Sequence, residues 1–451
     1  FGWVGSAYLL ATSAVMPVYG KLGDLFGRKY VMIFAVVLFT IGSLACGLAW
    51  SMDSLIAARV LQGLGGGGIM VSIFSVNADL FAPRERARYQ SYSSLVIMAS
   101  GSVGPILGGT MSDLFGWRSI FLINLPIGIV VLLGLAFLLP YRRPDRQPKI
   151  DYIGAVLLAA AISSVVLWAD SAELFGSLIA WQSLAIIAFA IVCATLWVQV
   201  EKRAPEPIVP LRLFKDSTFP LLMIISIVSG GLGIGMVNYY ALFLQTTTGL
   251  SPSEAGLFFI AVTGGIVMGS LTAGRLISKT GSYKPFSIIS LSIAVVAMLS
   301  LSQVHAGTPL AIIAALLLLQ GLGVGLGQQA PIIGVQNSAA KADIGAASGA
   351  VTLTRMGGAA LAISIYGAVI SSSLKGTGAD IQGVGNIQEL TPKMLAQLPA
   401  ASQHAVADLY AAAFTPLFLV AAATAVIGLV AAVMLKNVRL PISMEQKAPQ
   451  D

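Results

Sequence analysis

Side chains suited to covalent or metal chemistry are scarce in this chain. The two cysteines, Cys46 and Cys193, lie far apart in apolar runs, and the two histidines, His305 and His404, lie in loop-like segments. This distribution predicts no disulfide framework, no metal site and little material for a histidine-centred catalytic triad. The phosphate-binding pattern G-x-x-x-x-G-K-[ST] is absent, so transport driven by ATP is not expected. We therefore expect no enzyme activity, no cofactor and no resident metal.

Two arginines inside long apolar runs are the stronger candidates for function. Arg355 lies roughly 16 Å into its run, and Arg59 lies roughly 8 Å from the nearer end of its own. An unpartnered charge at such depth costs at least about 2.5–3.5 kcal/mol. No acid lies comparably deep, and Asp79 and Glu254, near segment ends, are the fallback groups for proton binding. We expect both arginines to act in proton coupling or in a cavity; snorkelling of Arg59 and a structural role of Arg355 are the alternatives.

The elements that hold these arginines must be membrane helices. Of 451 residues, 57% are hydrophobic and 10% are charged, against about 25% charged in ordinary soluble domains. A membrane-spanning helix needs about 20 mostly apolar residues. Thirteen segments meet this requirement and predict an all-α polytopic membrane protein: 3–19, 30–49, 54–77, 89–111, 118–139, 152–169, 178–199, 217–244, 252–277, 284–303, 309–333, 344–371 and 411–435.

The basic residues predict the orientation of these segments. The net charge is +7, and most Lys and Arg residues fall in loops that follow odd-numbered segments or in the tail. Because basic loops stay on the cytoplasmic side, the charge reflects topology and no nucleic-acid partner is expected. We expect a multi-pass protein of the bacterial inner membrane, monomeric in the bilayer, with a cytoplasmic C-terminus. The chain begins without Met, on the outer face, which we interpret as the lack of a first helix, so that fourteen are expected.

An internal repeat divides the chain. G-K-L-G-D-L-F-G-R-K at Gly20 is similar to G-R-L-I-S-K-T-G-S-Y-K at Gly274, and L-Q-G-L-G occurs at both Leu61 and Leu319, in the same order. Two parallel six-helix halves with two inserted helices explain this spacing. We expect a first half at 1–140 without its first helix, an inserted pair with basic linkers at 141–216, a second half at 217–436 and a cytoplasmic tail at 437–451.

These motifs resemble the major facilitator superfamily over essentially the whole chain. Arg59, Gln62 and Gly63 resemble its fourth-helix signature, and W-R-S-I-F-L-I-N-L-P-I-G at Trp117 and Q-T-T-T-G-L-S-P at Gln245 resemble the fourteen-helix drug:proton antiporter branch. The resemblance also covers a cytoplasmic gating loop of Gly20, Asp24, Gly27, Arg28 and Lys29, its repeat at Gly274 and Gly281, and the antiporter element of Gly104, Pro105, Gly108 and Gly109.

The resemblance implies a mechanism for these residues. Asp24 would form a latch with nearby cations or a helix N-terminus, and Ser278 at the repeat position would leave the latch one-sided. Pro105 should kink its helix, whose glycine face would seal against the partner half. Two interpretations remain for five polar side chains, namely contacts with the substrate and interhelical hydrogen bonds. These residues are Gln62, Asn238, Tyr239, Gln328 and Gln329.

The expected function is export of amphipathic or cationic drug-like compounds by proton antiport and alternating access. The substrate would be a small molecule, and the coupling carboxylate would belong to the first helix. An exporter of lipids or endogenous metabolites, and a non-transporting truncated product, are the alternatives.

Overall fold

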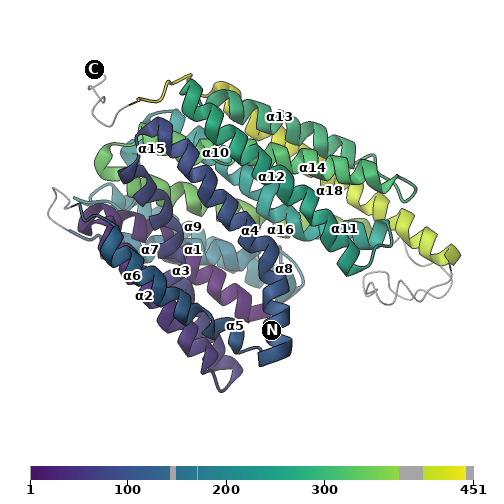
Figure 1. Ribbon diagram of the computed structural model, residues 1–451, viewed down its shortest axis with the longest axis horizontal. Helices are drawn as coiled ribbons and strands as arrows, with labels where there is room; N and C mark the ends of the chain where they lie inside the picture. The colour runs from purple at the N-terminus through teal and green to yellow at the C-terminus, as the bar shows by residue number, and fades with distance from the viewer. Residues whose placement is uncertain (1, 143–148, 170, 375–399, 443–451) are drawn as a thin grey trace.

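The computed structural model describes residues 2–142, 149–169, 171–374 and 400–442, and in these ranges every regular element is a helix. Figure 1 shows a first bundle, purple to blue, and a second one, teal to yellow. The first bundle contains α1 (Gly2–Phe26), α2 (Arg28–Gly47), α3 (Met52–Leu80), α4 (Pro83–Phe115), α5 (Ser119–Leu122) and α6 (Asn124–Leu138).

The rest of the chain supplies the inserted helices and the second bundle. The inserted part contains α7 (Tyr152–Ala169), α8 (Ser171–Phe175) and α9 (Trp181–Glu201), followed by the 3-10 turn η1 (Leu211–Lys215). The second bundle contains α10 (Thr218–Gly230), the π-helical η2 (Gly231–Gly235), α11 (Met236–Thr247), α12 (Pro252–Thr280), α13 (Lys284–Leu301), α14 (Leu310–Gly327), α15 (Ala330–Ser338), η3 (Lys341–Asp343), α16 (Ile344–Leu374) and α18 (Ala400–Met434).

The helices confirm the all-α polytopic prediction. In the described residues, eleven helical segments are long and apolar enough to cross a membrane. The remaining two predicted segments, the first and the fourth, coincide with the continuous helices α1 and α4. The last segment begins earlier than expected, because α18 starts at Ala400 and so includes His404, which we placed in a loop.

The internal repeat is visible as matching helix contacts. Gly63 of α3 lies against Tyr8 of α1, since a Cβ there would be 2.5 Å from the Tyr8 carbonyl oxygen, and Gly321 of α14 meets Val262 of α12 in the same way, at 2.1 Å. The next glycine of each L-Q-G-L-G copy, Gly65 or Gly323, faces Phe39 of α2 or Ile293 of α13. The repeated glycines therefore serve close helix packing in both bundles.

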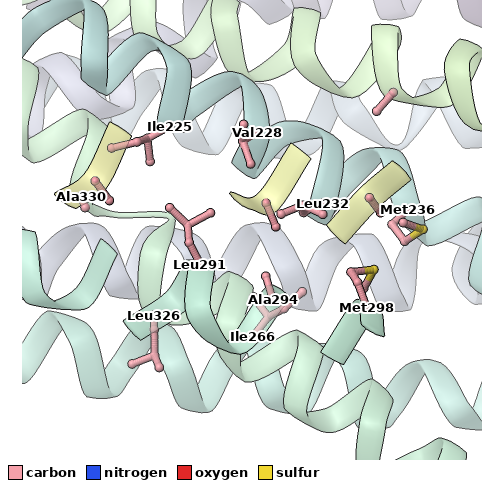
Figure 2. Close-up of a cluster of buried hydrophobic side chains, with 14 of the residues drawn as sticks. Ile225, Val228, Leu232, Met236, Ile266, Leu291, Ala294, Met298, Leu326 and Ala330 are labelled. Carbon is pink, nitrogen blue, oxygen red and sulfur yellow. The ribbon is translucent and has the colours of Figure 1, made fainter. Parts of the chain in front are cut away.

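The core of the second bundle is built from apolar side chains spaced three or four residues apart. Figure 2 shows Val228, Leu232 and Met236 on the α10–α11 segment pointing toward Leu291 and Met298 on α13. This spacing places the side chains on one face of each helix. The packed face orients the other side of α10 toward α16, where the functional residues of this bundle lie.

The inserted helices do not stand apart from the two bundles. The pair α7 and α9 pack on each other, and α7 also contacts α1 of the first bundle and α16 of the second. The Ser364 hydroxyl of α16 donates a hydrogen bond of 2.5 Å to the carbonyl of Ala169 at the end of α7. The inserted pair is therefore in contact with the interface between the bundles.

Candidate functional site

The two bundles meet through two equivalent helix pairs, α1 with α16 and α4 with α12; Figure 1 shows α4 running along α12. A Cβ on Gly20 would lie 2.3 Å from the Gly345 carbonyl oxygen. A Cβ on Gly274 would lie 2.5 Å from the Ser91 hydroxyl and 2.8 Å from the Ala87 carbonyl oxygen. Both contacts lie near the ends of α1 and α12 that precede the basic turns. Small residues thus allow the bundles to close at the end predicted to be cytoplasmic.

Asp24 joins the bundles at the first of these contacts. Its carboxylate accepts hydrogen bonds from the amides of Gly345, at 2.9 Å, and Ala346, at 3.0 Å, in the first turn of α16. The same carboxylate lies 3.1 Å from the Arg28 guanidinium, and its side chain is 2% exposed. A carboxylate at a helix N-terminus is favoured by the free amides and the helix dipole. Asp24 thus pairs with both a helix N-terminus and a cation, and its release as a latch stays a prediction.

Arg28 fastens the turn that carries Asp24. Its guanidinium lies 3.1 Å from the Asp79 carboxylate and donates a hydrogen bond to the Ser75 carbonyl, both on α3. The expected gating loop is nearly all helical, because α1 continues to Phe26 and α2 begins at Arg28. Gly27 alone makes the turn, with a φ of 89°, a conformation that other residues rarely adopt. Lys29 donates to the Ala136 carbonyl at the exposed surface.

The second contact also has a glycine turn with a positive φ, but it has no carboxylate. Gly281 has a φ of 71°, and a Cβ there would lie 2.7 Å from Arg84. Arg84 donates to the Leu440 carbonyl at 3.0 Å, and the Leu440 amide donates to the Gly281 carbonyl at 2.7 Å. Ser278 stands in place of Asp24. This corner is therefore held by backbone carbonyls and a cation rather than by a carboxylate.

A layer of buried glutamines connects the bundles further in, and the sequence analysis missed most of it. Gln336 of α15 accepts a hydrogen bond from Gln90 of α4 and donates to the Phe74 carbonyl of α3, each at 3.1 Å. Gln329 donates to the Ser94 hydroxyl of α4 at 2.7 Å. A side-chain amide inside an apolar run is the sequence signal for such a buried contact. Only Gln329 was among the predicted site residues, because Gln90 follows the arginine-rich start of its helix and so does not stand out.

The antiporter glycines make no close contact with the described part of the other bundle. A methyl group on Gly104, Gly108 or Gly109 of α4 would meet none of the described residues within 4 Å, and the same holds for Gly256 and Gly264 on α12. The expected contact of this glycine face with the partner half is therefore not seen among the described residues in this conformation, where α4 and α12 meet tightly near the ends predicted to be cytoplasmic. Its role as a seal stays a prediction. Pro105 lies within α4, but its side chain is outside the described residues.

Arg59 is bound within the first bundle. It donates to the Val4 carbonyl at 2.9 Å and to the Gln62 side chain at 2.5 Å, and its guanidinium lies 4.2 Å from the centre of the Tyr8 ring. The Gln62 amide in turn donates to the Ser43 hydroxyl at 2.6 Å. These contacts connect α1, α2 and α3 and give the cation two hydrogen-bond acceptors and an aromatic face.

Arg355 has far fewer partners. Its Nη2 donates to the Gln328 carbonyl at 2.6 Å, while its buried Nε has no hydrogen-bond partner among the described residues. Gln328 lies in the break between α14 and α15, followed by Pro331, which has no amide hydrogen. Glu254, a fallback acid, lies elsewhere, where it caps α12 through Ser251. Arg355 is thus a half-buried cation held by one carbonyl.

The predicted substrate residues lie mostly in interhelical hydrogen bonds. Gln62 and Gln329 make the bonds given above, Gln328 donates to the Ser270 hydroxyl at 2.6 Å, and Tyr239 donates to the Ile363 carbonyl at 2.5 Å. The side chain of Asn238 lies outside the described residues. Four of the candidates thus have the structural partners that the alternative interpretation required.

The linker after the inserted helices adds ion pairs that the sequence analysis did not predict. Lys21 of α1, 2% exposed, lies 2.7 Å from Glu206, and Arg212 of η1 lies 2.5 Å from Asp343 beside α16. These pairs connect the linker to both bundles. Further along the chain, the pKa of Asp216 lies below its usual value. The main cause is the hydrogen bond that its carboxylate accepts from the Thr218 amide, and Lys436, 3.3 Å from the carboxylate, adds to it.

The comparisons with known proteins agree with this architecture. The model of the family described as Major Facilitator Superfamily matches residues 1–363. The chain therefore belongs to the major facilitator superfamily.

Several relatives are similar over almost the whole chain. The MFS-type transporter Rv1877 of Mycobacterium tuberculosis is 33% identical over 97% of this chain, which spans 64% of that protein, just under two thirds. Multidrug resistance protein 3 of Bacillus subtilis is 30% identical over 99% of the chain and 90% of its own length. The chain is thus related to multidrug efflux transporters.

Two solved structures share the fold. The human organic anion transporter MFSD10 superposes with a TM-score of 0.64 at 15% identity, covering 94% of this chain and 83% of its own. The proton:xylose symporter XylE superposes with a TM-score of 0.58 at 17% identity, covering 94% and 84%. At these identities the likeness concerns the fold alone.

Proposed function

We propose that this protein exports amphipathic drug-like compounds, cationic ones among them, across the bacterial inner membrane by proton antiport. The similarity to efflux transporters supports export, and the superfamily fold supports alternating access between two bundles. The partners would be a small-molecule substrate, protons and the lipid bilayer, and the working unit would be a monomer with its C-terminus in the cytoplasm. The chain would be divided into a first half at residues 1–140, an inserted helix pair at 141–216, a second half at 217–436 and a tail at 437–451.

One observation carries the alternating-access part of the proposal. The tight contacts between α1 and α16 and between α4 and α12 lie near one end of these helices. By contrast, a Cβ on Gly104 or Gly108 of α4, or on Gly256 or Gly264 of α12, would meet none of the described residues within 4 Å. A pair of bundles joined at one end can rock about the contact. This conformation corresponds to a transporter closed toward the cytoplasm, with Asp24 holding the first turn of α16.

The test is dye export from bacterial cells that express the protein. Cells loaded with ethidium should extrude it faster than cells with an empty vector, and a protonophore should abolish the difference. In reconstituted vesicles, an imposed pH gradient should drive ethidium movement without ATP. Extrusion that continues unchanged after the proton gradient collapses would rule out proton antiport.

A further inference from the structure

The interior of the described spans carries positive charge without matching negative charge. Every described Asp or Glu in a long helix lies near an end of the helix or of its apolar span, as Asp24, Asp79 and Glu254 do. Arg59 and Arg355 lie deeper in α3 and α16. Arg59 is satisfied by a carbonyl, an amide and an aromatic ring. Arg355 is therefore the interior cation with the least compensation among the described residues.

The helix packing does not itself require a cation at position 355. Ala87 of α4 and Gly345 of α16 occupy matching places, opposite the repeat glycines Gly274 and Gly20. Counting the same number of residues onward from each places Ile97 of α4 at the position of Arg355. An apolar side chain thus suffices at this level of the fold in the other bundle. Retaining a charge that costs several kcal/mol to bury points to a function.

The surroundings of Arg355 have features of a ligand site. The backbone beside it is interrupted twice: α10 becomes π-helical at Gly231, directly after Gly230, whose Cβ would clash with the Arg355 carbonyl, and the α14–α15 break holds Gln328. Irregular backbone at membrane depth is tolerated where it is enclosed by protein or lines a cavity, and transporter sites are often built there.

Arg355 also lies next to the deepest polar contact between the bundles. The neighbour of its hydrogen-bond partner Gln328 is Gln329, which bonds Ser94 of α4. Farther from the end predicted to be cytoplasmic, a Cβ on Gly101 or Gly104 of α4 would meet none of the described residues within 4 Å. The guanidinium thus lies where the tight contact ends, and its side chain is partly exposed.

We propose that Arg355 binds the anionic group, a carboxylate or a sulfonate, of an amphipathic substrate, so that anionic amphiphiles are the class this site selects. Arginine offers five N–H donors, and one of them has the Gln328 carbonyl as its partner. Paired charge-assisted hydrogen bonds to an anion would satisfy the remainder and offset the cost of burying the cation. This inference rests on the proposed export function and adds anionic amphiphiles to the cationic compounds that the function includes.

The test uses three probes with one scaffold and different head groups. They are 11-(dansylamino)undecanoic acid, its neutral primary amide, and 11-(dansylamino)undecylamine, which is cationic. Binding to the protein in lipid nanodiscs is followed by energy transfer from tryptophan to dansyl, with empty nanodiscs subtracted. The native protein should bind the acid at least about tenfold more tightly than the amide, since a hydrogen bond to a charged group is worth roughly 1.5–3 kcal/mol.

Variants separate binding from folding. Arg355→Met should weaken binding of the acid at least tenfold and change binding of the amide less than threefold, whereas Arg355→Lys should retain part of the preference. Arg439→Gln removes an exposed cation in the tail and should leave all three affinities unchanged. If Arg355→Met does not fold, Arg355→Lys still tests the idea, because only the acid should bind more weakly.

Two results would overturn the inference: a native protein without preference for the acid, or variants that lose all three probes equally, as a structural role predicts. The export proposal is judged separately, by proton-driven movement of ethidium in vesicles. If the acid binds in a way that depends on Arg355 but no transport is seen, the proposed anion site stands and the export proposal is rejected. If ethidium is transported but binding of the acid does not depend on Arg355, the export proposal stands and the proposed anion site is rejected.

Discussion

The two contacts between the bundles have the same shape but different chemistry. At the α1–α16 contact, glycine backbones touch and Asp24 bonds the first amides of α16. At the α4–α12 contact, Gly274 meets a serine hydroxyl as well as a carbonyl, and the corner is held by Arg84 instead of an acid. The repeat therefore conserves close backbone approach, while only one contact carries a charged latch whose release can be tuned.

The largest effect should come from filling the glycine contacts. Gly20→Ala places a methyl group 2.3 Å from a backbone carbonyl and should disfavour the closed form by about 3 kcal/mol, at the upper end for overpacking. Spin labels on the exposed positions Tyr30 and Lys279 report this as a longer distance between the bundles.

The matched variant at the other contact sharpens the comparison. Gly274→Ala should have a similar effect, but the additional change Ser91→Ala should relieve part of it, because a side chain lies nearest there. At Gly20 the three atoms nearest to an added Cβ all belong to the backbone, so no shortened side chain would give such relief. Equal rescue by a neighbouring small residue at both contacts would contradict the distinction.

The second effect concerns the charge itself. Asp24→Asn removes a buried carboxylate from two amides and Arg28, and should weaken closure by about 2 kcal/mol, or more than tenfold in population. Ser278→Ala, the repeat position, should change the spin-label distances little. Closely similar responses of the two variants would mean that the two contacts are equivalent after all.

A smaller effect is expected in the glutamine layer shared by both contacts. Gln90→Leu and Gln336→Leu should each favour separation of the bundles, and the double variant should cost less than the sum, with a coupling of about 1 kcal/mol. The spin-label distance distribution measures each population. Strict additivity would show that the 3.1 Å hydrogen bond contributes no interaction energy.

The smallest effect belongs to the exposed pair of Lys436 and Asp216. Because the folded protein lowers the pKa of Asp216, this carboxylate stabilises the fold above its ordinary pKa of 3.8 and loses that contribution as pH falls below it. Lys436→Gln should therefore lower the thermal midpoint slightly at neutral pH and not at all in strong acid. Exposed pairs contribute little, so a large shift at pH 7 would indicate an unrecognised role for the linker.

The sequence by itself determined the membrane class, the thirteen helical segments and the repeat. These follow from local features: runs of apolar residues, the position of Lys and Arg, and glycines at fixed spacing. It also pointed to Asp24, because orientation rules do not explain an acid in a cytoplasmic turn. Its loop boundaries were less accurate, since a single glycine such as Gly27 can turn the chain and leave the flanking residues helical.

Only the tertiary structure decided which residues meet across the bundles. Gln90 and Gln336 pair across the bundles, and Lys21 of the first bundle pairs with Glu206 of the linker. Both pairs are far apart in the chain, and their pairing depends on how helices pack rather than on any local pattern. The same holds for Arg59 and Arg355, which look alike as charges in apolar runs. Among the described residues, packing gives the first two hydrogen-bond acceptors and an aromatic ring and leaves the second with one carbonyl, because hydrogen-bond satisfaction is a property of the neighbours and not of the residue.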